Sequence, residues 1–253
     1  MSSLLRPILL FSFFATPLAA AFAQVDTIDI SRDLQLKNLP EGRNQYSVTL
    51  HMPNGTLKYV GLWSRTVRIV VIGGKQRIVI DQDWWTSDSA AHRKVYSICS
   101  REDLSPIYHY SKDGKGKVEA FNFTASSVTG SDTTADNSRK GFELPLTMPT
   151  LNWELDLEIF QTLPFAAGKT FVISFYHPGG PPPSYYSYTV TGDEELALAG
   201  GGQADCWVMT IDYGGGRGST TFWISKKSRE VLRTKDSFGG AYRYKVKLAT
   251  ETL

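Results

Sequence analysis

Six segments between residues 169 and 248 decide the fold of this chain: KTFVISFYH (169–177), SYYSYTV (184–190), DCWVMTIDY (205–213), STTFWIS (219–225), EVLRTK (230–235) and AYRYKVKL (241–248). Each is rich in aromatic and β-branched residues, and glycine or proline runs separate several of them, as they separate strands. Neighbouring residues of a strand face opposite ways, so aromatic side chains point to both faces of the expected sheet. We therefore expect consecutive antiparallel strands with an apolar covering on each face.

The first half of the chain repeats this pattern. Tyr46, Val48 and Leu50 alternate with polar residues, and Asn54 stands before a glycine at the position of a hairpin turn. The continuous apolar run 67–72 predicts a strand that is central in the sheet or covered on both faces. Further strands are expected at 76–81, 93–98, 106–111 and 118–123.

Residues 151–163 carry the one helical pattern of the chain. Leu155 and Ile159 lie on one helical face, Asn152 stands where a cap is expected, and Pro164 follows the end. The segment also alternates between apolar and acidic residues, so a strand is the alternative; we favour the helix. The predicted fold class is mainly β: a strongly curved antiparallel sheet, a half-barrel or open barrel, with this helix packed on its concave face.

Two polar features are expected to face solvent. In the last strand Arg243, Lys245 and Lys247 alternate with apolar residues, which predicts an exposed basic face. Residues 126–140 are rich in Ser, Thr, Asp and Asn and predict an exposed loop, with a short strand at 127–130, within one domain.

The N-terminal residues are typical of an export signal. Arg6 precedes an apolar run, and the small residues Ala21 and Ala23, on either side of Phe22, fit a cleavage site. We expect a signal peptide at 1–23 that is removed near Ala23, a loosely held lead-in at 24–43 and a single β-rich domain at 44–253. An uncleaved N-terminal anchor is the alternative. The mature chain is expected in the periplasm or outside the cell, without a transmembrane span.

Charge and motifs exclude several function classes. The chain has 27 Lys and Arg residues and 25 Asp and Glu residues, a net charge of +2, which argues against a dedicated nucleic-acid binder. The glycine-rich stretch 214–220 lacks the Lys-Ser/Thr ending of a phosphate loop and lies between strands. We expect no cofactor, and the sequence leaves the oligomeric state open.

The two cysteines, Cys99 and Cys206, form a candidate disulfide if the chain is exported, because oxidising compartments permit such bonds. The alternative is two buried thiols, since sequence does not give the distance between them.

No catalytic or metal-binding constellation is recognisable. The histidines, at positions 51, 92, 109 and 177, lack metal-ligand spacing, and no G-x-S-x-G motif occurs. The carboxylates of Asp81 and Asp83 are expected at a strand end, and those of Glu154, Asp156 and Glu158 on the polar face of the helix. The basic turn 226–229 is expected to be a solvated hairpin tip; contact with a membrane surface or an acidic partner is the alternative. We predict a non-catalytic protein.

The aromatic residues are the remaining candidates for a site. We predict that an apolar pocket in the half-closed sheet binds a lipid or another apolar group. The candidate ligand-binding residues are Trp207, Trp223, Phe175, Phe171, Met209 and Trp85. A fully packed aromatic core is the alternative.

Several segments resemble the exported bacterial proteins grouped as the domain of unknown function 3108 family. They are IYHY (107–110), LPF (163–165), FYHPGG (175–180), YTVTG (188–192), DCWV (205–208), TFWISKKSREVL (221–232) and YRYKVKL (242–248). The resemblance covers about residues 100–248. It implies a periplasmic, non-catalytic β-rich domain whose curved sheet is similar to that of the lipoprotein carriers LolA and LolB. It supplies no catalytic residues, and this chain lacks the N-terminal lipidated cysteine of the LolB type.

Three functions remain in view. The first is a carrier or binding module for a lipid or other apolar group at the cell envelope. The second is a structural or interaction module with an envelope protein as its partner, and the third is a hydrolase of an envelope polymer.

Overall fold

The computed structural model describes residues 25–29, 32–198 and 201–249, so the predicted signal peptide lies outside the described residues. The strands are β1 (Val25–Thr27), β2 (Gly42–His51), β3 (Leu57–Ile72), β4 (Lys75–Thr86), β5 (Arg93–Ser100), β6 (Pro106–Asp113), β7 (Val118–Phe123), β8 (Ser127–Gly130), β9 (Glu143–Pro145), β10 (Leu151–Asn152), β11 (Thr170–Tyr176), β12 (Ser184–Ala197), β13 (Gln203–Asp212), β14 (Ser219–Ser225), β15 (Val231–Phe238) and β16 (Ala241–Lys247). The helical elements are η1 (Leu36–Asn38), η2 (Ser89–Ala91), η3 (Trp153–Leu155) and α1 (Asp156–Gln161).

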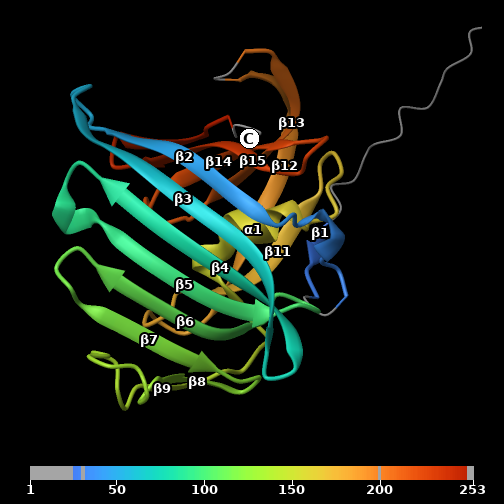
Figure 1. Cartoon of the computed structure of the whole chain (residues 1–253). Coiled ribbons are helices and arrows are strands. Elements are labelled where there is room, and N and C mark those ends of the chain that lie inside the picture. Colours follow the sequence, from blue (N-terminus) through green and yellow to red (C-terminus); the bar gives the residue numbers. More distant parts are fainter. Residues whose placement is uncertain (1–24, 30–31, 199–200, 250–253) are drawn as a thin grey trace, which may run out of the picture.

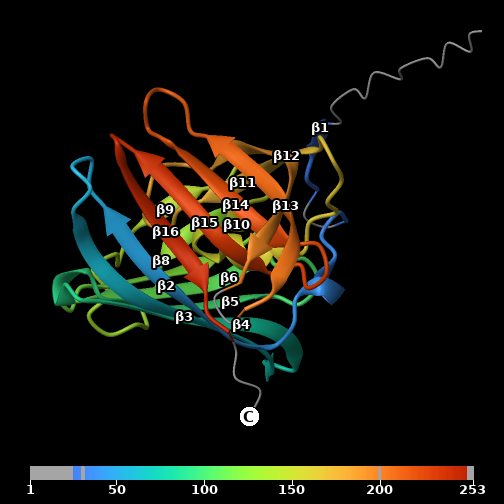
Figure 2. The ribbon, with the colours of Figure 1, turned by 90° about the horizontal axis from the view of Figure 1, so that it is seen from above.

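All described strands belong to one curved sheet. Its order is β1-β11-β12-β13-β14-β15-β16-β2-β3-β4-β5-β6-β7-β8-β9, and β10 pairs with β11 beside β1. Neighbours are antiparallel except for β1 and β10, which run parallel to β11. The sheet bends around α1 and stays open, because its order ends at β1 and β9 (Figures 1 and 2). The predicted fold class is confirmed.

The helix forms within the predicted segment. The Asn152 side chain accepts a hydrogen bond from the Glu154 N–H at 3.0 Å, which caps η3, and α1 continues from it. Phe160 of α1 lies among the rings of Tyr188 (4.9 Å) and Phe222 (4.9 Å) on the concave face of the sheet. The main core therefore lies between the helix and this face.

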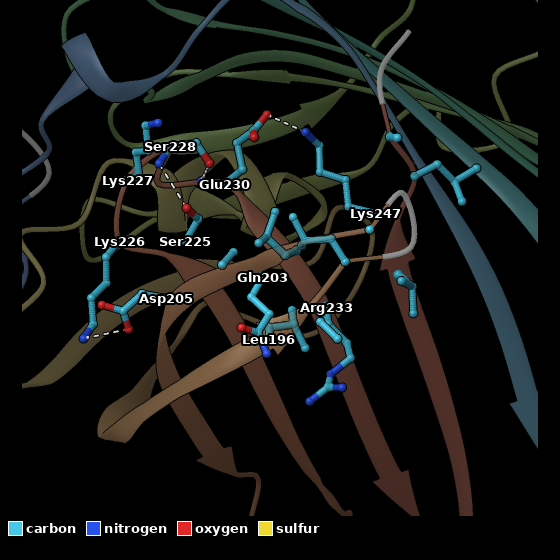
Figure 3. Close-up of a pocket in the computed structure, with 18 residues that line it drawn as sticks. Leu196, Gln203, Asp205, Ser225, Lys226, Lys227, Ser228, Glu230, Arg233 and Lys247 are labelled. Carbon is cyan, nitrogen blue, oxygen red and sulfur yellow. Dashed lines mark hydrogen bonds and ion pairs between the residues drawn. The ribbon is translucent and has the colours of Figure 1, made fainter.

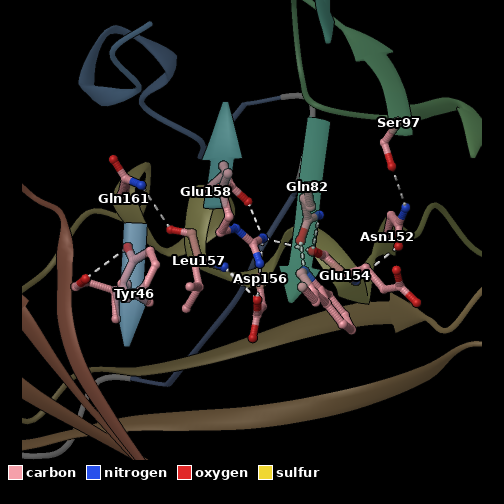
Figure 4. Close-up of polar contacts among 12 residues, drawn as sticks. Tyr46, Gln82, Ser97, Asn152, Glu154, Asp156, Leu157, Glu158 and Gln161 are labelled. Carbon is pink, nitrogen blue, oxygen red and sulfur yellow. Dashed lines mark hydrogen bonds and ion pairs between the residues drawn. The ribbon is translucent and has the colours of Figure 1, made fainter. Parts of the chain in front are cut away.

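A buried ion pair fixes the helix to the sheet. Arg65 of β3 donates from Nε and Nη2 to the carboxylate of Glu158, at 2.8 and 2.5 Å. Arg65 also donates to the Glu154 carbonyl at 2.8 Å, as does the Gln82 amide of β4 at 2.9 Å. Arg65 is 3% exposed and Glu158 2%. Figure 4 shows Glu158, Glu154 and Gln82 lying together where the helix meets the sheet.

The lead-in is part of the fold, and its prediction as a loosely held segment was wrong. Val25–Thr27 pairs with Thr170–Val172 along the edge of the sheet, and Ile28 and Leu39 are buried in the main core. The open edge of β11 explains this placement, because its backbone groups need partners.

The run 67–72 belongs to a central strand, because β3 lies between β2 and β4, but its alternative, coverage on both faces, was wrong. These residues continue β3 toward its hairpin with β4, where the sheet extends beyond the core. Val67 is buried, but Val71 is 70% exposed.

The basic residues of the last strand do not form an exposed face, contrary to prediction. Lys245 is buried on the concave face, where its Nζ lies 5.4 Å from the centre of the Trp63 ring. Arg243 pairs there with Asp236 at 2.6 Å. β16 lies between β15 and β2 in the middle of the sheet, and alternation alone does not tell which of its two faces is the concave one.

The loop at 126–140 is anchored by Asn137, whose side chain bonds to both the N–H and the carbonyl of Ala120 in β7. The short strand predicted inside it is confirmed as β8.

The buried ion pair gives a direct stability test. We expect Arg65→Met to lower the free energy of unfolding by about 3–5 kcal/mol, because Glu158 is left buried without a counter-charge. The double variant Arg65→Met/Glu158→Met should recover most of this loss. Urea unfolding measures both. The control is Arg68→Met, on the same strand as Arg65, which removes an exposed ion pair with Asp81 of β4. A loss at Arg65 no larger than at Arg68 contradicts the anchoring role.

Candidate binding site

The concave face is filled where the sequence predicted a pocket. Phe171, Phe175 and Met209 are buried in the main core. The Phe175 ring packs edge-on against Trp153 at 5.1 Å and against Tyr188 at 6.2 Å. These three predicted residues lie in the arrangement of the alternative, a packed aromatic core.

The other three predicted residues lie at the margin of this core or outside it. Trp207 packs against the core and stacks on Phe165, and the Lys226 ammonium lies 4.6 Å from its ring centre. Trp223 belongs to a small apolar cluster outside the main core, and Trp85 is 54% exposed. The structure thus does not bring the six predicted residues together in one site.

Cys99 and Cys206 are free, buried thiols, so the candidate disulfide is not formed. Cys99, on β5, belongs to the main core. Cys206, on β13, belongs to the small apolar cluster that also contains Trp223. The two strands are far apart in the order of the sheet, which is why the thiols do not meet.

A buried polar group beside the helix has the residue types of a catalytic triad. The His109 Nδ1 lies 3.0 Å from Ser97 Oγ and 3.0 Å from the Asn152 amide nitrogen, and Nε2 lies 3.7 Å from Glu154 Oε2. Burial lowers the pKa of His109 to about 3, so the ring is neutral. Ser97 and His109 are both fully buried, so a substrate does not reach this hydroxyl. The group joins the helix to β5 and β6.

This neutral histidine predicts a pH dependence of stability. Between pH 6.5 and about 3 the unfolded chain protonates His109 while the folded protein does not, so stability falls as the pH drops through this window. The loss is up to about 1.4 kcal/mol per pH unit. In urea unfolding across this range, His109→Gln should lose that part of the slope, with His51→Gln as the control for removing a histidine. An unchanged slope in His109→Gln contradicts a buried neutral ring.

An open groove of about 970 Å³ lies at one end of the sheet. The pairing of β12 with β13 shifts its register between Val190 and Gly192. Cys206 of β13 pairs with Ser225, the last residue of β14, and β13 begins three residues earlier, at Gln203. The β12–β13 hairpin therefore runs past the end of β14. The lining residues come from this hairpin, the β14–β15 turn and the end of β16: Leu196, Ala197, Leu198, Gly201, Gln203, Ala204, Asp205, Ser225, Lys226, Lys227, Ser228, Glu230, Leu232, Arg233, Val246, Lys247, Leu248 and Ala249.

The groove combines an apolar lining with charged borders. Leu196, Ala204 and Leu232 belong to the small apolar cluster with Trp223, and Val246 and Leu248 extend the lining. Figure 3 shows the turn residues Lys226–Ser228 on one side and Lys247 on the other.

Most of the lining cations are held by carboxylates. Lys226 pairs with Asp205 at 3.0 Å, Lys247 pairs with Glu230 at 2.7 Å, and Arg233 pairs with Glu194 at 3.4 Å. The Arg233 guanidinium also lies 3.7 Å from the centre of the Trp223 ring. Trp223 and Trp207 thus border the groove through Arg233 and Lys226, although neither lines it.

This groove was not predicted from the sequence. One signal was the apolar triplet 196–198, which stands between charged residues and a glycine run at a hairpin tip. The other was the basic turn at 226–229, predicted as a solvated tip, which instead borders the groove with Lys226 and Lys227.

The model of the family described as Protein of unknown function (DUF3108) matches residues 45–247. The chain belongs to this family. The match includes the buried ion pair, the helix, most of the groove, most of β2 and all of β3–β16, so the DUF3108 region covers nearly all of the curved sheet. No curated protein matches the chain significantly.

Among the described residues of this DUF3108 protein, no helix is long and apolar enough to cross a membrane. Within the same residues, no group of three or more His, Cys, Asp or Glu side chains is arranged to hold a metal ion.

Proposed function

We propose that this protein is a non-catalytic binding or carrier module for a lipid or another apolar group. The binding site in this proposal is the groove bordered by the β12–β13 hairpin, the β14–β15 turn and the end of β16. The observation that carries the proposal is the set of leucine, valine and alanine side chains that line an open groove of about 970 Å³. This volume falls within the range of about 300–1,000 Å³ that is usual for ligand pockets.

The lining supports an elongated apolar ligand. Leu196, Leu232 and Val246 come from three different strands and continue one apolar surface, which Leu198 and Leu248 extend. Leu196 is already buried, so the gain on binding comes from Leu198, which is 38% exposed, and from the half-buried Leu232, Val246 and Leu248. Covering them with an acyl chain releases ordered water and contributes about 25 cal/mol per Å² of apolar surface buried.

The export part of the proposal rests on the N-terminal sequence. An apolar run after Arg6 and the small residues Ala21 and Ala23 predict a cleaved signal peptide. The proposed carrier then works at the cell envelope, in the periplasm or outside the cell.

The groove is tested with dodecanoate, a single-chain amphiphile, on protein from which co-purified lipid has been extracted. In isothermal titration we expect Leu232→Gln to weaken binding by about tenfold or more, because a buried apolar contact is replaced by an amide. The matched control is Leu57→Gln, since Leu57 is exposed at the start of β3, outside the groove lining. No binding by the wild type, or an equal loss in the control, contradicts the proposal.

A structural or protein-interaction module is the second candidate function. The filled concave face favours it, because Phe171, Phe175 and Met209 have no space to hold a ligand. The same titration separates the two functions, since an interaction module without a ligand site does not bind dodecanoate at Leu232.

The hydrolase alternative is not favoured. Glycoside hydrolysis needs two carboxylates that reach a substrate in a cleft. Glu158 is buried and paired with Arg65, and Glu154 is buried and paired with Arg93 at 2.7 Å.

A further inference from the structure

The groove opens onto the convex face of the sheet, opposite the helix. Strand register places one row of side chains on this face: Trp85, Leu62, Ser47, Val246, Arg233 and Trp223 are consecutive cross-strand partners from β4 to β14. Val246 and Arg233 of this row line the groove. The row therefore connects the groove with the exposed pair Leu62 and Trp85, across the small side chain of Ser47.

Large apolar side chains are exposed along this part of the convex face. Trp85 is 54% exposed, Val60 44% and Leu62 38%. Val60 and Leu62 lie on the same face of β3, and Leu62 is directly opposite Trp85. Three large apolar residues exposed side by side indicate an interaction surface rather than scattered surface residues.

The same face is strongly basic. On the convex side of strands β16 and β2–β5 the register places six cations: Arg43, Lys58, Arg68, Lys75, Arg77 and Lys94. It places two carboxylates there, Asp81 and Asp83. The difference, 6 − 2 = +4, exceeds the net charge of +2 of the whole chain, so positive charge is concentrated on this face.

Tyrosines complete the surface. Tyr242 and Tyr244 of β16 lie on the convex face, where the Tyr242 ring stacks on His51 at 4.7 Å. Tyr96 of β5 packs edge-on against Tyr108 of β6 on the same side. A hollow of about 430 Å³ on this face is lined by Tyr96 and Tyr110, by the cations Arg43 and Lys94, and by the carboxylates Asp81 and Asp83.

From this composition we infer that the convex face of β16 and β2–β5 is a docking surface for an anionic lipid bilayer. Tryptophan and tyrosine favour the boundary between head groups and acyl chains, and lysine and arginine are attracted to anionic head groups. Trp85, Leu62 and Val60 enter this boundary, and the surrounding cations contact the phosphates. The inference rests on the proposed function in one respect: the bilayer is the source or the destination of the ligand in the groove.

The continuity of the row gives the surface a role in transfer. A lipid that leaves the bilayer beside Trp85 passes Leu62 and Ser47 and reaches Val246 at the groove without leaving the convex face. The apolar side chains along the row reduce the exposure of an acyl chain to water.

The experiment measures binding of the purified protein to vesicles by co-sedimentation. One set of vesicles contains phosphatidylcholine alone, and a second contains phosphatidylcholine mixed with phosphatidylglycerol. We expect binding to the anionic vesicles only, and weaker binding at high salt. Lys58→Glu/Lys94→Glu should weaken it by about tenfold or more. The matched control is Lys115→Glu, in the exposed turn between β6 and β7.

A second readout locates the contact. Vesicles whose acyl chains carry bromine quench tryptophans that enter the bilayer boundary. We expect quenching of the wild type and little quenching of Trp85→Phe, because the other tryptophans of the chain are buried or half-buried.

Each outcome decides a separate point. Equal binding to neutral and anionic vesicles, or unchanged quenching in Trp85→Phe, overturns the docking surface. If light scattering shows that the wild type is a dimer and that Trp85→Phe is a monomer, the docking surface is also overturned, and the face instead binds a second copy of this chain. Vesicle binding without dodecanoate binding leaves the surface standing and overturns the groove; the reverse result overturns only the surface.

Discussion

The ion pair between Arg65 and Glu158 is the constraint on which the rest of the structure depends. α1 has six residues, too few for a stable isolated helix. Glu158 points at the sheet, where a buried guanidinium neutralises its carboxylate and also binds the Glu154 carbonyl. Such a pair specifies one position of the helix, since any shift leaves a buried charge without a partner.

The position of the helix determines where a ligand has room. Phe160 and its neighbours on α1 fill the concave face against Phe175, Tyr188 and Phe222. The concave side is therefore a core, although a curved open sheet offers a cavity in principle. The free space described above lies where the β12–β13 hairpin runs past β14, on the convex side. Function is thereby proposed for the face that the helix does not cover.

Much of the architecture was predictable because it depends on local patterns. Alternation identified most strands, and the cap at Asn152 with Pro164 bounded the helix. The contacts that specify the site are not local. Arg65 and Glu158 are 93 residues apart, and three separate segments line the groove. Alternation also does not distinguish a concave from a convex face, which is why Lys245 was expected in solvent and is buried under Trp63. The aromatic residues were rightly singled out as unusual, but most of them pack the core.

The central claim is that an apolar ligand binds in the groove and not in the concave core. The most direct test is a titration of isotope-labelled protein with dodecanoate, followed by amide chemical shifts. The account predicts that the largest chemical-shift changes occur at the amides of Leu196, Ala204, Leu232 and Val246. The chemical shifts of the Phe171, Phe175 and Met209 amides should stay unchanged. Shifts that concentrate in the second set, or no shifts at saturating dodecanoate, contradict it.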